Sequence, residues 1–257
     1  PQRRPRSWPW ALKIHVLGEF RLERDAEPLN FGAKPAARSL DLLRVLAVVK
    51  DHTCALAALH DGFWPDADGD MAKAACEQAL HRLRKLLGRA DLVVQRQGKL
   101  KLAMDQVWID IDDWEQAVHE AAAEIIQLEA LFLAFPGPLL IHERENPWSA
   151  TAAERVRSKL LEIARGLGDH YERQGAGDQA RRIHLRSLDF YPQAARVHEA
   201  LISGSLARDD MVSAWEDYER FQRSRSGEGD DEISPALQAR LQRGVKPSAE
   251  GRTIGSL

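Results

Sequence analysis

Apolar and polar residues alternate near the start of the chain. The apolar positions of this alternation are Leu12, Ile14, Val16, Phe20 and Leu22. Gly18 interrupts the pattern, and the turn-like residues 24–28 separate it from Leu29 and Phe31, which begin a third apolar segment. Because side chains of a strand point to opposite faces in turn, a period of two predicts strands with one buried face. We expect a small antiparallel sheet here.

The period then changes to that of a helix. Apolar residues recur at helical spacing over residues 36–50, 55–64 and 70–87, with Asp70 as the expected N-cap of the third helix. The buried stripe of this third helix is predicted to be Cys76, Leu80, Leu83 and Leu87. Two short apolar segments within residues 92–102, joined by a turn at Gln97 and Gly98, predict a closing hairpin. A sheet, three helices and a hairpin form a winged helix.

Beyond residue 105 the pattern is almost wholly helical. The expected helices cover residues 114–135, 150–174, 177–190, 194–207, 211–225 and 234–243, with a loop through 146–148. Small residues recur 34 positions apart at Ala180 and Ala214, and Pro192 ends the intervening helix, as in tetratricopeptide repeats. An unrelated helical bundle is the alternative. The expected fold class is mainly α with small antiparallel sheets: a winged helix-turn-helix domain followed by an all-α, TPR-like repeat domain.

Composition limits the class of protein. The 257 residues carry a net charge of −3, with 44 % hydrophobic and 29 % charged residues, which is typical of a globular protein. No apolar run is long enough to span a bilayer, so no membrane partner is expected. Cys54 and Cys76 are too few for a disulfide framework or a zinc site and predict buried thiols in the cytoplasm. The chain begins at Pro1 with a linker-like segment, residues 1–10, so we expect it to be a piece of a longer protein.

Positive charge gathers on the third helix and the hairpin. The cations of this stretch are Lys73, Arg82, Arg84, Lys85, Arg89, Arg96, Lys99 and Lys101. The same stretch contains only two carboxylates, Glu77 and Asp91, so its net charge is +6, whereas the chain as a whole is anionic. Cations concentrated on one helix and one loop suit a polyanion, because each cation placed on a phosphate releases condensed counterions. The pattern predicts binding to double-stranded DNA.

The stripe of buried residues decides which side chains of the helix face outward. Gln78, His81, Arg82 and Lys85 are the expected base-reading residues, since arginine pairs with guanine and glutamine with adenine in the major groove. The expected phosphate contacts are Lys73 and Arg84 on the helix and Lys99 and Lys101 on the wing. A solvated basic helix face is the plainer interpretation of the same residues. Lys34 and Arg38, near the start of the first helix, are weaker candidates for contact with the DNA backbone. They are not counted among the predicted contact residues.

Other clusters carry less chemistry. Asp110, Asp112 and Asp113 fit a helix start, where carboxylates favour the dipole, better than a metal site. The sequence has no phosphate loop, nucleophile elbow or Cys–His pair, so neither an enzyme nor a cofactor is expected. Aromatic and histidine positions of the repeats either pack in the core or line a groove for a peptide or small molecule. They are Tyr171, His184, Tyr191, Trp215 and Tyr218.

Short motifs in order along residues 11–243 resemble one family. They are Leu17-Gly18-Glu19-Phe20, Trp64-Pro65-Asp66, the third helix from Leu80 to Gly88, Val107-Trp108-Ile109-Asp110, Phe135-Pro136-Gly137-Pro138, Trp148 with Glu154-Arg155-Val156-Arg157, and Glu232-Ile233-Ser234-Pro235. The chain resembles the SARP-type transcriptional regulators, which join an OmpR-type winged helix to a bacterial transcriptional activator domain. It departs from them at Leu100, where the wing usually carries an aromatic residue.

The resemblance implies a domain plan and partners. It implies a linker at 1–10, an OmpR-type winged helix at 11–106, a TPR-like activator domain at 107–243 and a flexible tail at 244–257. The third helix would lie in the DNA major groove, and the repeats would mediate dimerisation, signal reception or contact with RNA polymerase. An upstream sensor or ATPase domain is expected in a longer protein. The alternative is an interaction or ligand-sensing module that does not bind DNA.

Overall fold

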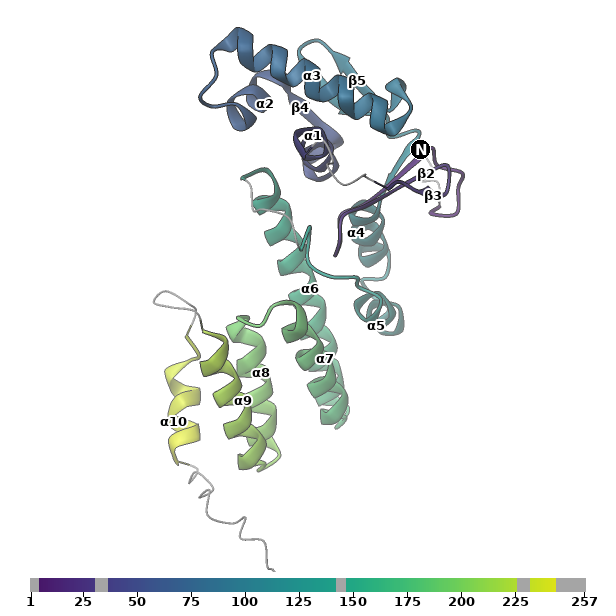
Figure 1. Cartoon of the computed structure of the whole chain (residues 1–257). Helices are drawn as coiled ribbons and strands as arrows, with labels where there is room; N and C mark the ends of the chain where they lie inside the picture. Colours follow the sequence, from purple (N-terminus) through teal and green to yellow (C-terminus); the bar gives the residue numbers. More distant parts are fainter. Residues whose placement is uncertain (1–4, 31–36, 142–146, 226–231, 244–257) are drawn as a thin grey trace, which may run out of the picture. The chain divides into compact units, whose positions relative to one another are not determined.

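A computed structural model describes residues 5–30, 37–141, 147–225 and 232–243 (Figure 1). The chain divides into two compact units, residues 1–156 and 157–257. No helix in the described ranges is long and apolar enough to cross a membrane. The predicted fold class is confirmed: small sheets and three helices precede an all-helical region.

A four-stranded sheet opens the first unit, in the order β3-β2-β1-β7. Its strands are β1 (Leu12–His15), β2 (Arg21–Arg24), β3 (Glu27–Pro28) and β7 (Val107–Ile109). The alternation buries Leu12 and Ile14 completely. The third strand was predicted too late, at Leu29 and Phe31, and Phe31 lies outside the described residues. Asp25 and Ala26 both have positive φ and close a two-residue turn, so pairing resumes at once with Glu27.

Three α-helices follow, as predicted. They are α1 (Ala37–Val48), α2 (Leu56–Phe63) and α3 (Gly69–Leu87), with the short 3-10 helix η1 (Lys50–His52) after α1. The buried side of α1 includes Leu43 and Leu46, both fully inaccessible. Ser39 also joins α1 to α3, because its hydroxyl donates a buried hydrogen bond of 2.9 Å to the carbonyl oxygen of Ala79. These contacts fix α3 at the surface of the unit with one face inward.

The N-cap of α3 is Asp68, and the prediction of Asp70 was wrong. The Asp68 carboxylate accepts a 2.9 Å hydrogen bond from the backbone N–H of Met71, while Asp70 lies inside the first turn. The helix begins at Gly69, one residue earlier than the apolar pattern indicates, because the cap is set by a local hydrogen bond rather than by burial. At the other end, Gly88 in the left-handed conformation ends the helix as predicted.

This correction has a direct test. Asp68→Ala is expected to destabilise the first unit by about 1 kcal/mol, because an unsatisfied amide is left at the helix start. Asp70→Ala removes only a favourable charge near the helix dipole and should cost a few tenths of a kcal/mol. Urea unfolding followed by circular dichroism gives both values. A larger loss for Asp70→Ala than for Asp68→Ala would contradict the assignment.

A three-stranded sheet forms the wing. The predicted hairpin is confirmed as β5 (Val93–Arg96) and β6 (Lys99–Leu102), preceded by the 3-10 helix η2 (Ala90–Leu92). A third strand, β4 (Thr53–Ala55), pairs with β6 and was not predicted. Its three residues are too short for a periodic signal, and their pairing partner lies more than forty positions further along the chain. Leu100, at the position of the expected aromatic, is fully buried.

The predicted single helix over 114–135 is wrong, because two helices occupy this region. Helix α4 (Asp110–Glu120) and helix α5 (Ile125–Leu133) are separated by a turn at residues 121–124. Alanine-rich residues there favour a helix locally, so the pattern contains no break. The turn brings the chain back on itself, and the Phe135 ring lies 5.1 Å from that of Trp114, both buried. Tertiary packing therefore overrides the local preference.

The remaining helices include the repeat unit. They are α6 (Pro147–Arg173), α7 (Gly177–Phe190), α8 (Ala195–Ala207), α9 (Met211–Ser224) and α10 (Pro235–Arg243). Figure 1 shows α7 to α10 as successive helices lying side by side. Ala180 and Ala214, 34 positions apart, are both fully buried, as the repeat pattern predicts. Helix α6 begins earlier than expected, since Pro147 occupies a first helical position, where its missing N–H costs nothing.

Candidate nucleic-acid interface

The buried stripe of α3 is confirmed and determines its outer face. Cys76, Leu80, Leu83 and Leu87 are at most 3 % exposed. Four of the eight predicted contact residues, Gln78, His81, Arg82 and Lys85, lie on the opposite, exposed side of the same helix. A fifth, Lys73, is exposed beside the buried stripe, near Cys76 and Leu80. The amphipathic pattern therefore presents amide, imidazole and cationic groups together on one helix surface.

Arg84 differs from these five residues. It is half-buried, and its Nε and Nη2 donate hydrogen bonds of 3.2 and 2.8 Å to the carbonyl oxygen of Val93. Val93 begins β5, so the guanidinium joins the exposed helix to the wing. The sequence shows only a cation at a helical position. This hydrogen bond was not predicted, because no neighbouring residue identifies Val93 as the partner. The predicted phosphate contact of Arg84 stays a prediction.

The wing adds cations at its free end. Lys99 and Lys101 are exposed on β6, while Leu100 and Leu102 between and after them are buried. Arg96 on β5 is also exposed and lies directly opposite Lys99 in the strand register. Like charges at facing positions destabilise a sheet. Arg96 was not among the predicted contact residues, and hairpin register was the signal that could have found it.

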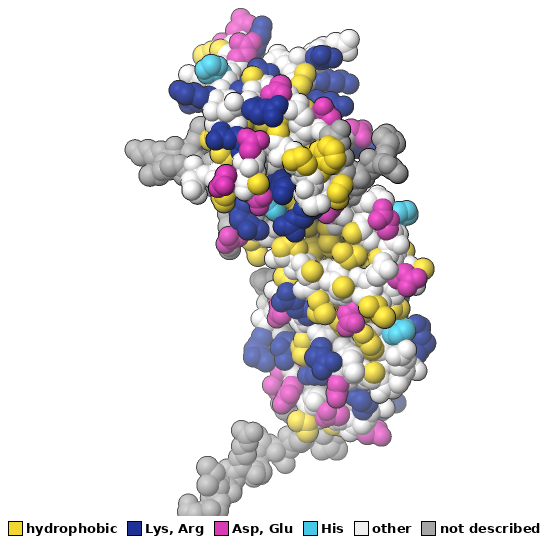
Figure 2. Space-filling model, turned by 90° about the vertical axis from the view of Figure 1, so that its right-hand side faces the viewer, with side chains coloured by type: hydrophobic (Ala, Val, Ile, Leu, Met, Phe, Trp, Pro, Cys, Tyr) yellow, Lys and Arg dark blue, Asp and Glu magenta, His cyan; other side chains and the backbone are white. Residues whose placement is uncertain are grey.

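Little negative charge offsets this surface. Asp91 is held by Arg89 in a two-bond ion pair, with Nη2 and Oδ2 2.7 Å apart, so these two charges cancel. Within the described ranges no ion pair engages the remaining exposed cations: Lys73, Arg82, Lys85, Arg96, Lys99 and Lys101. Figure 2 shows lysine and arginine side chains at the upper end of the first unit, with aspartate and glutamate side chains among them. Asp70 and Glu77 are the exposed carboxylates on α3 itself.

The acidic residues at the start of α4 are structural. Asp110 is buried and accepts hydrogen bonds of 2.9 and 3.2 Å from the backbone N–H groups of Val16 and Leu17, which ties α4 to the first sheet. Asp112 lies 3.0 Å from Nε2 of His52. Burial alone would lower the pKa of His52, but the hydrogen bond and charge of Asp112 outweigh it and raise that pKa. No group of three or more potential metal ligands occurs among the described residues.

The two weaker candidates for DNA contact, Lys34 and Arg38, have different outcomes. Lys34 lies outside the described residues. Arg38 is exposed, and its guanidinium lies 5.7 Å from the centre of the Phe63 ring and 3.8 Å from Asp41. The ring of Trp148, which the sequence placed in a loop, stacks on Phe63 at 6.4 Å. This surface is occupied by packing contacts.

The aromatic and histidine positions of the repeats mostly pack in cores. Trp215 and Tyr218 lie against the apolar cluster of α8, α9 and α10, and Tyr191 lies against a second cluster between α7 and α8. The Tyr171 ring is half-buried beside His170. His184 is buried, and it lines a cavity.

Comparisons with known proteins show the fold. Neither protein-family profiles nor curated proteins match the sequence. Among solved structures, EmbR of Mycobacterium tuberculosis, in complex with a low affinity phosphopeptide, is similar with a TM-score of 0.64 and 20 % identity. The similarity covers 91 % of this chain, which spans 65 % of the length of that one. The chain thus has a SARP-type fold, a winged helix followed by a helical domain, as its sequence motifs predicted.

Proposed function

We propose that this chain, with its SARP-type fold, is a sequence-specific DNA-binding transcription regulator. The observation that carries the proposal is the exposed face of α3, where Arg82 and Lys85 stand unpaired among the described residues. The winged-helix context supports it, because in such folds a surface helix enters the major groove. An anionic duplex would also relieve the repulsion between Arg96 and Lys99.

The residues divide by what each would contact. Gln78, His81, Arg82 and Lys85 read base edges from the exposed face of the second half of α3. Lys73 contacts phosphate, as do Lys99 and Lys101 on the wing. Arg84 also bonds to Val93 and thereby holds the wing at a set position relative to the reading helix.

The finer parts of the proposal concern the whole regulator. The protein acts in the cytoplasm as an activator, with a DNA-binding domain at 11–106 and an activator domain at 107–243. The helical repeats mediate assembly with a second copy or contact with RNA polymerase. An upstream sensor or ATPase domain controls the output. The fold supports these roles by similarity alone.

Salt dependence tests DNA binding directly. The operator is first selected from a random duplex pool, and its dissociation constant is then measured between 50 and 200 mM salt. The three exposed cations assigned to phosphate, Lys73, Lys99 and Lys101, would give a logarithmic slope near −3 and an affinity loss of roughly fiftyfold over that range. Phosphate contacts must weaken in this way because displaced counterions are released into a more concentrated solution.

The control for this measurement is a variant with one cation removed. Lys101→Ala should reduce the slope by about one unit and weaken binding to all sequences alike. If no sequence is enriched and the slope is near zero, the winged helix does not bind DNA. The chain would then be an interaction or ligand-sensing module.

A further inference from the structure

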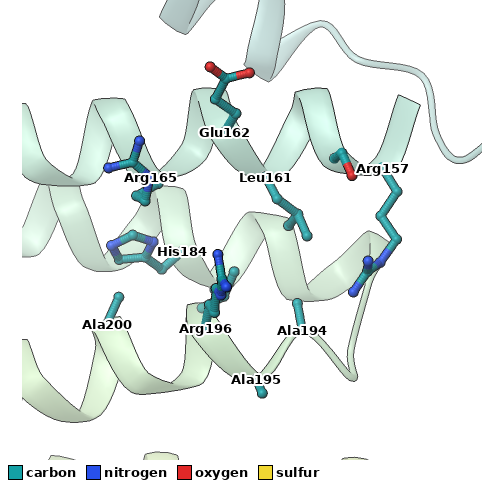
Figure 3. A pocket seen from close by; sticks show the side chains of 11 residues that line it. Arg157, Leu161, Glu162, Arg165, His184, Ala194, Ala195, Arg196 and Ala200 are labelled. Atoms are coloured by element: carbon teal, nitrogen blue, oxygen red, sulfur yellow. The ribbon is translucent and has the colours of Figure 1, made fainter. Parts of the chain in front are cut away.

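The second unit contains a cavity of about 540 Å³ between α6, α7 and α8. Figure 3 shows the side chains around it, which project from three successive helices of the repeat unit. Its polar lining is Arg157, Ser158, Glu162, Arg165, His184 and Arg196. The volume falls within the range of sites for small molecules. It is far from the DNA-facing residues in sequence and belongs to a separate unit.

The lining is rich in arginine. Arg165 bonds to Asp169 at 3.2 Å, and the guanidinium of Arg157 lies 6.0 Å from the centre of the Tyr191 ring. Arg196 is exposed and has no ion pair among the described residues. The single carboxylate of the lining, Glu162, already faces Lys159 at 3.3 Å. Net positive charge therefore remains at the mouth of the cavity.

His184 is the informative residue of the lining. It is only 6 % exposed, and its buried Nδ1 has no hydrogen-bond partner. Burial lowers the pKa of His184, against the opposing charges of Asp169 and Glu172, so the imidazole is neutral near pH 7. A buried polar atom without a partner costs about 1–3 kcal/mol. The close approach of Gly168, where no side chain would fit beside the ring, holds the imidazole in this place.

Apolar groups complete the cavity. Leu161 on α6 and Val197 on α8 also line it, together with Ala194, Ala195 and Ala200. A ligand that matches this lining has an anionic end for Arg196 and an apolar body that packs against the His184 ring. We propose that this cavity binds a small organic anion, a carboxylate or a phosphate ester, that Arg196 pairs with it, and that it lies against the His184 ring. This site goes beyond the proposed DNA binding and does not depend on it.

The test uses the full chain and simple probes. Benzoate and phenyl phosphate carry an anionic group on an apolar ring, and benzyl alcohol is the neutral counterpart. With isotope-labelled histidine, nuclear magnetic resonance should show saturable shifts of the His184 ring with at least one of the two anions and weaker binding of the alcohol. The His184 signal is assigned with a His184→Gln variant. The two anions separate a carboxylate site from a phosphate site.

Variants at exposed residues can test the proposal, because they do not disturb the buried core. Arg196→Ala should weaken anion binding at least tenfold, because a charge-assisted bond is lost. Arg182→Ala, an exposed arginine of α7 outside the lining, should leave binding unchanged. The proposal is overturned if neither anion shifts His184, if benzyl alcohol binds as tightly, or if Arg196→Ala binds as the unaltered chain does. These titrations report on the second unit, so their failure leaves the DNA result untouched.

Discussion

Replacing Arg82 and Lys85 together by alanine is expected to abolish operator binding in a gel-shift assay. Both side chains are exposed on α3, opposite the stripe of Leu80, Leu83 and Leu87. A base-contacting arginine or lysine contributes about 1–3 kcal/mol, so two of them correspond to roughly thirtyfold to twenty-thousandfold in affinity. Circular dichroism should be unchanged, because neither side chain has a hydrogen bond or ion pair to lose in the described part of the unit.

A matched control separates specific contact from general charge. Arg21→Ala with Lys50→Ala removes the same charge from exposed positions of the first unit that lie outside α3 and the wing. We expect this variant to bind within a few fold of the unaltered chain, since exposed charges at a distance are screened by salt. Equal binding by both double variants would remove α3 from the interface, whatever the salt dependence shows.

The second large effect is expected for stability, from Asp217→Ala in the repeat unit. The Asp217 carboxylate is completely buried and receives two hydrogen bonds from Arg181, with Nη2 and Oδ1 3.0 Å apart. Ser205 donates a further, long bond of 3.4 Å. The hydrogen bond to Asp217 raises the pKa of Arg181. Removing Asp217 leaves Arg181, whose side chain is only 23 % exposed, without its carboxylate partner and costs about 3 kcal/mol, the lower end of the range for buried pairs.

Scanning calorimetry of the repeat-unit transition measures this loss. The control is Asp189→Ala, which removes the partner of Arg186 from an exposed pair 3.9 Å apart and should cost no more than about 0.5 kcal/mol. The double variant Arg181→Met with Asp217→Leu should recover much of the stability, because apolar residues of similar volume need no compensation. Similar losses for Asp217→Ala and Asp189→Ala would show that the buried pair contributes little.

Part of the candidate interface could be predicted from sequence. The helical period identifies which residues of α3 are buried, and the outward position of Arg82 and Lys85 follows from it. The alternation in β6 likewise separates Lys99 and Lys101 from the buried leucines. The partner of Arg84 could not be predicted, because its bond to Val93 crosses from helix to strand.

The sequence by itself determined the order of elements in the winged helix, the buried stripe of α3 and the 34-residue period of the repeats. The spacing of apolar residues along the chain indicates which positions are buried. Tertiary structure alone decided the rest. The pairing of β4 with β6 and of β1 with β7, and the break between α4 and α5, depend on residues distant in sequence. The cavity at His184 exists only where three helices meet. Such contacts arise from the packing of whole elements, and no short segment encodes them.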